Sequence, residues 1–88
     1  MSDASDLMKI DFSTFVLSLS TSALYEMGLV EGPGGDANPQ PNKALAHQII
    51  DTLEMLREKT RGNLDDAETK LVDSLLYELR MQFVKIRG

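Results

Sequence analysis

The chain has 88 residues, a formal net charge of −5 and no cysteine. A chain of this length forms one small domain with a marginal core, and the lack of cysteine excludes disulfides and thiol chemistry. The net negative charge argues against a nucleic-acid partner. The absence of cysteine fits a reducing cytoplasm, where we expect the protein to lie.

Residues 1–11 are predicted to be a flexible acidic lead-in. Asp3, Asp6 and Asp11 stand there against a single base, Lys9, whereas a signal peptide begins with positive charge and continues with an apolar run. We therefore expect no secretion signal, and a single helical domain over residues 12–88.

A first helix is predicted over about residues 12–27, with Asp11 as its N-cap and Gly28 just after its end. Hydroxyl residues interrupt it, and it is shorter than the roughly 20 apolar residues that cross a bilayer, so no membrane span is expected. Its main apolar lobe consists of Phe12, Phe15, Val16, Leu19, Ala23 and Met27.

The same helix carries a second apolar lobe, Leu17 and Leu24, with the small Ser13 and Ser20 between the two lobes. An ordinary core helix and a membrane-surface helix are alternatives, but the latter usually carries basic residues on its polar face. We favour a helix that contacts both its own chain and a second subunit.

Residues 28–41 form a predicted linker, because they hold most of the glycines and all three prolines. A connection of this length is long for two packed helices. Its Gly-Pro-Gly-Gly run lacks the lysine and hydroxyl residue of a phosphate-binding loop, so the role of the linker stays open.

A second helix is predicted over about residues 43–61, capped by Asn42 and ended by Gly62. Its core stripe is Leu45, Ala46, Ile49, Ile50, Leu53 and Leu56, and its opposite side carries His47, Asp51, Glu54 and Glu58. Imidazole and carboxylates on one face can bind a divalent metal. Ion pairing on a solvated ridge explains the row more simply, so neither metal nor cofactor is predicted.

A third helix is predicted over about residues 66–86, where Asp65 and Glu68 have the spacing of a capping box. Its core stripe is Leu71, Val72, Leu75, Leu76, Leu79, Phe83 and Ile86. Tyr77, Met81 and Val84 form a second apolar ridge at i, i+4, i+7 spacing, which we interpret as a contact with another subunit or partner. The short turn before this helix predicts an antiparallel hairpin with the second helix.

Three stretches resemble a family of short bacterial proteins catalogued only as a domain of unknown function. They are FVLSLSTSAL (residues 15–24), IDTLEMLREKTRGNL (50–64) and LLYELR (75–80). The resemblance covers residues 12–84 and implies a small cytoplasmic helical protein without an assigned activity, cofactor or functional residue.

The sequence thus predicts an all-α unit of three helices that forms a homo-oligomer, most simply a two-fold dimer. The expected interface residues are Leu17, Leu24, Tyr77, Met81 and Val84. The first functional hypothesis is a self-associating structural or adaptor module, and the second is a module that captures an amphipathic helix of another protein in an apolar groove.

The third hypothesis is an enzyme or metal carrier built on His47, Asp51 and Glu54. No catalytic residue is predicted, because no nucleophile has a base and an orienting partner.

Overall fold

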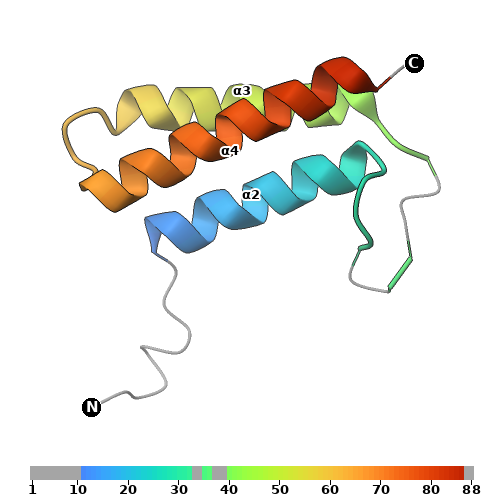
Figure 1. The fold of residues 1–88 in the computed structure, drawn as a ribbon, viewed down its shortest axis with the longest axis horizontal. Helices are drawn as coiled ribbons and strands as arrows, with labels where there is room; N and C mark the ends of the chain where they lie inside the picture. Colours follow the sequence, from blue (N-terminus) through green and yellow to red (C-terminus); the bar gives the residue numbers. More distant parts are fainter. Residues whose placement is uncertain (1–10, 33–34, 37–39, 87–88) are drawn as a thin grey trace, which may run out of the picture.

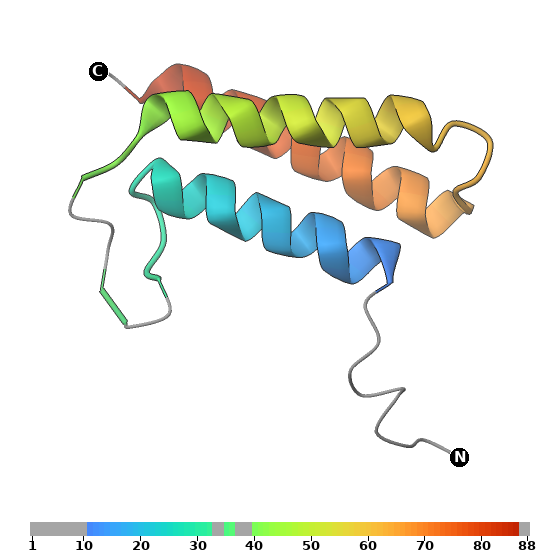
Figure 2. The ribbon, with the colours of Figure 1, turned by 180° about the vertical axis from the view of Figure 1, so that it is seen from behind.

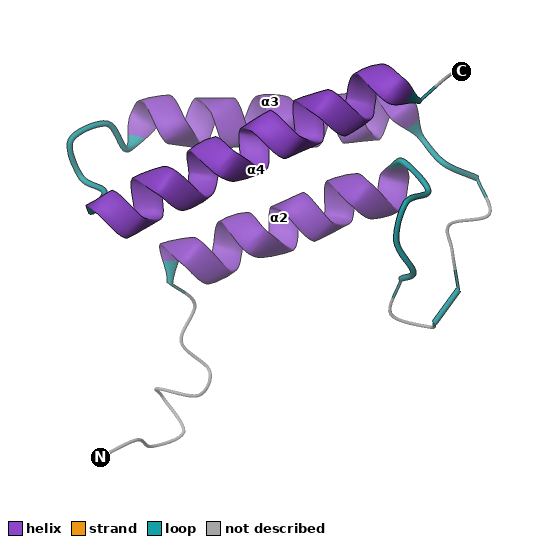
Figure 3. Ribbon diagram, viewed as in Figure 1, coloured by secondary structure: helices purple, strands orange, loops and turns teal. Residues whose placement is uncertain are grey.

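The structure, a computed structural model, describes residues 11–32, 35–36 and 40–86. In this part of the chain it contains α2 (Phe12–Glu26), α3 (Lys43–Lys59) and α4 (Asp66–Lys85), drawn in Figures 1 and 3. The predicted all-α unit of three helices is confirmed. The predicted lead-in lies outside the described residues except for Asp11.

Each helix begins at the N-cap that the sequence predicts. Asp11 accepts a hydrogen bond from the Thr14 N–H at 2.8 Å, and Asn42 accepts one from the Leu45 N–H at 2.9 Å. At the start of α4 the Asp65 side chain accepts a hydrogen bond from the Glu68 N–H, and the Glu68 side chain accepts one from the Asp65 N–H, which completes the capping box. These side chains satisfy backbone donors that the first turn leaves free, so the starts are fixed by local chemistry.

The helices end one or two residues before the predicted limits of 27, 61 and 86. Gly28 and Gly62 adopt the left-handed conformation, with φ of 79° and 86°, just beyond the ends of α2 and α3. At the end of α3 the Thr60 hydroxyl donates to the Leu56 carbonyl at 2.7 Å. Because Thr60 is already the C-cap of α3, Arg61 falls in the turn instead of the helix.

The core lies between the three helices. Its buried apolar residues are Val16, Ala23 and Met27 from α2, Ala46, Ile50 and Leu53 from α3, and Val72, Leu76 and Leu79 from α4. Two residues of the predicted stripes are instead exposed, Phe15 at 41% and Leu45 at 42%. Each directly precedes a buried residue, so it stands about 100° away from that residue, at the edge of the packed arc.

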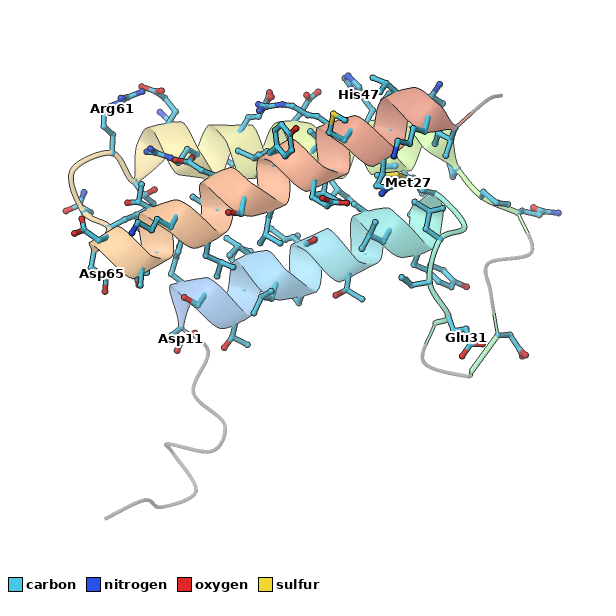
Figure 4. The ribbon with its side chains drawn as sticks, in the orientation of Figure 1. Asp11, Met27, Glu31, His47, Arg61 and Asp65 are labelled. Atoms are coloured by element: carbon cyan, nitrogen blue, oxygen red, sulfur yellow. The ribbon has the colours of Figure 1, made fainter. Side chains whose placement is uncertain are left out.

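α3 and α4 run side by side in opposite directions, and α2 lies along both of them (Figures 1 and 2). The predicted hairpin is therefore present. Two ion pairs join its helices, from Arg57 Nε to Asp73 Oδ1 at 2.8 Å and from Arg80 to Glu54. Figure 4 shows Asp11 and Asp65 at one end of the bundle, so α2 and α4 run in the same direction.

The segment between α2 and α3 returns along the end of α2. The Leu29 N–H donates to the Leu24 carbonyl at 2.9 Å, and the Asn42 N–H donates to the Glu26 carbonyl at 2.7 Å. A Cβ on Gly32 would lie 2.5 Å from Cε1 of Tyr25, so any larger residue there would force the Tyr25 ring to shift. Backbone bonds to α2 thus anchor both ends of the connection.

None of the helices in the described part of the chain combines the length and hydropathy of a membrane span.

Candidate interaction surface

The second apolar ridge of α4 is exposed in the folded chain. Tyr77 is 65% exposed, Met81 40% and Val84 75%. On a helix with about 100° per residue, Met81 lies roughly half a turn away from the buried Val72. The three side chains therefore form a strip that the helices of the same chain leave uncovered.

A groove between α3 and α4 runs beside this ridge. It has a volume of about 380 Å³ and is lined by His47, Ile50, Asp51, Glu54, Arg80, Phe83 and Val84. Figure 4 shows His47 on the side of the hairpin away from α2. Because Val84 belongs to both the ridge and the groove, they form one continuous surface. We call this surface, Tyr77, Met81, Val84 and the groove residues, the hairpin face.

Aromatic contacts build one end of the groove. The His47 and Phe83 rings lie 5.6 Å apart between centroids, at 53° to one another. Lys43 Nζ lies 4.9 Å from the Phe83 centroid, and it also donates to the Ile86 carbonyl at 3.4 Å. A cation over an aromatic face is attracted by the ring quadrupole, so Phe83 is held in place by α3.

The acidic row of α3 is paired with neighbouring bases. His47 Nδ1 lies 3.2 Å from Asp51 Oδ2, Glu54 pairs with Arg80, and Glu58 pairs with Arg61 at 2.5 Å. The hydrogen bond and the charge of Arg61 lower the pKa of the Glu58 carboxyl from its ordinary value. The row is therefore a partly neutralised edge of the hairpin face.

A metal site was the alternative interpretation of that row. Within the described residues, no group of three or more His, Asp or Glu side chains has an arrangement that could hold a metal ion. Glu54, one of the three proposed ligands, accepts instead from the Arg80 guanidinium.

The ion pair between Arg57 and Asp73 spans the two helices of the hairpin. Two hydrogen bonds join them, from Arg57 Nε at 2.8 Å and from Nη2 at 3.4 Å. Hydrogen bonding to Arg57 lowers the pKa of Asp73 from its ordinary value and raises that of Arg57. This bidentate pair joins α3 to α4 at one defined position along each helix.

The predicted interface residues of α2 lie elsewhere. Leu17 is 47% exposed, whereas Leu24 is half-buried and packs against the core. Ser20, which was grouped with them, is 6% exposed. The residues that line the groove all come from α3 and α4, so the structure brings together Tyr77, Met81 and Val84 but leaves Leu17 outside that surface.

Sequence reasoning did not identify Phe83 and Arg80 as part of this surface. Phe83 belongs to the predicted core stripe, and the sequence pattern alone gives Arg80 no place on this surface. A second hollow of about 420 Å³, lined by Thr21, Ser22, Tyr25, Glu26, Glu31 and Gly32, was also missed. It depends on how the chain after α2 folds back, for which the sequence carries no local signal.

A protein-family model matches most of the chain. The family model of a domain of unknown function, DUF1844, matches residues 9–85. This confirms the resemblance carried by the FVLSLSTSAL, IDTLEMLREKTRGNL and LLYELR stretches. No curated protein and no solved structure matches the chain.

Proposed function

The chain belongs to the DUF1844 family, a domain of unknown function, and we propose that it is a self-associating structural or adaptor module whose contact is the hairpin face. The observation that carries this proposal is the exposure of Tyr77, Met81 and Val84 in one strip of a helix whose other face is already buried. A helix with two apolar faces gains stability when both are covered.

The size of the strip predicts a weak association. Stable interfaces bury about 800 Å² on each partner, from roughly 20–30 residues, whereas the hairpin face consists of nine residues. The strip does contain an aromatic residue and a methionine, two residue types that are enriched in protein interfaces. We therefore expect a dimer that forms at micromolar concentrations and dissociates on dilution.

The experiment is sedimentation velocity over a dilution series, comparing Met81→Glu with Met55→Glu. Met81 is 40% exposed within the ridge, and Met55 is 48% exposed on α3 outside the hairpin face. Both variants add the same charge at a similar depth, so Met55→Glu is a matched control. A charge buried at an interface without a partner is strongly unfavourable.

Met81→Glu is expected to sediment as a monomer at concentrations where the wild type and Met55→Glu are dimers. Far-ultraviolet circular dichroism should show the same helical content in all three proteins. If Met81→Glu dimerises as strongly as the wild type, the ridge is not the contact. If both variants lose the dimer equally, the effect comes from net charge and the proposal is wrong.

The groove favours a second candidate function, the capture of an amphipathic helix from another protein. Its apolar side comes from Phe83 and Val84 and its acidic side from Asp51 and Glu54. This pattern suits a helix with one apolar and one basic face. A wild-type protein that stays monomeric at all concentrations and binds a synthetic basic amphipathic helix would favour this alternative over self-association.

A further inference from the structure

The charged residues beside the ridge favour one relative orientation of two associating copies. We propose that a second copy packs on α4 in antiparallel orientation, about a two-fold axis between Met81 and Val84. Glu78 of each copy then lies beside Lys85 of the other. This inference rests on the proposed self-association and adds its geometry.

The ridge has the spacing of a coiled-coil seam. Tyr77, Met81 and Val84 alternate in steps of four and three, the a and d pattern by which two helices interlock side chains. In a two-fold dimer about the proposed axis, the Met81 and Val84 end of each ridge lies against the same end of the other ridge.

One flank of this seam is free to contact a second copy. Glu78 and Lys85 both lie on it, seven residues apart and exposed. Glu78 accepts a hydrogen bond from Gln82 at 3.1 Å, and neither residue has an ion pair within the described part of the chain. The opposite flank is already engaged, because Asp73 and Arg80 pair with Arg57 and Glu54 of α3.

The order of charges distinguishes the two possible orientations. In a parallel pair, each residue of one flank faces the residue five positions later on the other flank of its partner. That arrangement puts Asp73 beside Glu78 and Arg80 beside Lys85, which are like charges. Like charges across an interface disfavour that arrangement.

In an antiparallel pair, identical flanks face each other. Glu78 then meets Lys85 of the other copy, and the symmetry repeats the contact at the other end of the seam. The same register brings Met81 of one copy beside Val84 of the other. The apolar seam and the free charged flank therefore select one antiparallel register.

Charge reversal tests this register by sedimentation at low ionic strength, where exposed charges are least screened. Lys85→Glu and Glu78→Lys each replace two attractions with two repulsions, and each is expected to weaken the dimer about tenfold. The double variant Glu78→Lys/Lys85→Glu exchanges the charges and should recover wild-type affinity. Lys59→Glu is the control, because it changes net charge as Lys85→Glu does but lies on α3 outside the hairpin face.

Cysteine trapping gives an independent readout, since the chain has no cysteine of its own. About the proposed axis, the two copies of position 77 are separated by about eleven residues along the helices, or roughly 16 Å. A disulfide needs Cα atoms within about 7 Å. Tyr77→Cys should therefore not cross-link to itself, whereas Met81→Cys mixed with Val84→Cys should give a disulfide heterodimer.

These outcomes separate the register from the self-association on which it rests. A wild-type dimer whose double charge variant is not restored, or in which Tyr77→Cys cross-links readily, overturns the antiparallel register and leaves self-association standing. A wild-type protein that is monomeric at every concentration overturns both.

Discussion

Replacing Leu53 with alanine should strongly destabilise the fold. Leu53 is 0% exposed and lies among the largest fully buried side chains. Leucine to alanine removes three carbon atoms, worth about 0.8 kcal/mol each, or about 2.4 kcal/mol in transfer free energy. The cavity left behind brings the expected loss to about 3 kcal/mol.

That loss is large for this chain. At about 0.05–0.15 kcal/mol per residue, a chain of this size has a free energy of unfolding of roughly 4–13 kcal/mol. A loss of 3 kcal/mol corresponds to a fall in melting temperature of about 12–24 °C for a domain of this size. Leu45→Ala is the matched control on the same helix, because Leu45 is 42% exposed; its cost should stay below about 1 kcal/mol.

The assay is urea unfolding followed by far-ultraviolet circular dichroism. Both substitutions are made in the Met81→Glu background, because dimer formation would otherwise add concentration-dependent stability. Equal losses for Leu53→Ala and Leu45→Ala would refute the assignment of the core. So would a Leu53→Ala protein as stable as its parent.

Two further predictions concern polar contacts. Asp65→Ala removes the capping box with Glu68 and should cost about 1 kcal/mol in thermal unfolding, more than Asp66→Ala in the same turn; an equal effect would mean that only helix-dipole charge matters. Hydrogen bonding to Arg57 depresses the pKa of Asp73, so this pair stabilises the fold above the unfolded pKa of about 3.9 and loses that contribution as the pH falls through the folded pKa. Because the Asp73 side chain is 54% exposed, Asp73→Asn should cost less than about 1 kcal/mol at neutral pH and nothing in strong acid; a difference that persists in acid would contradict the assignment.

Local sequence signals predicted the helices well. Asp11, Asn42 and Asp65 each cap a helix through their own side chains, and Gly28 and Gly62 supply the positive φ beyond a helix end. Such features depend on contacts within a few residues, so they can be read from the sequence directly. The end of α3 lies two residues before the predicted one, because Thr60 is already the non-helical C-cap and a turn leads from it to Gly62.

The candidate surface was only partly predictable. The exposed ridge follows from the period of one helix, but the half-burial of Leu24 depends on how α2 packs on the hairpin. The groove beside the ridge requires the register of α3 against α4, which the pairs of Arg57 with Asp73 and Arg80 with Glu54 define. These pairs span 16 and 26 positions, and a helical period does not specify contacts at that range.

Methyl NMR of the methionines over a dilution series tests the central claim most directly. It uses the unmodified sequence and reports both whether the chain associates and where. The Met81 methyl resonance should shift with protein concentration, while that of Met55, exposed outside the hairpin face, should stay constant. A Met81 resonance that is unchanged from dilute to millimolar protein would contradict self-association through the ridge of α4.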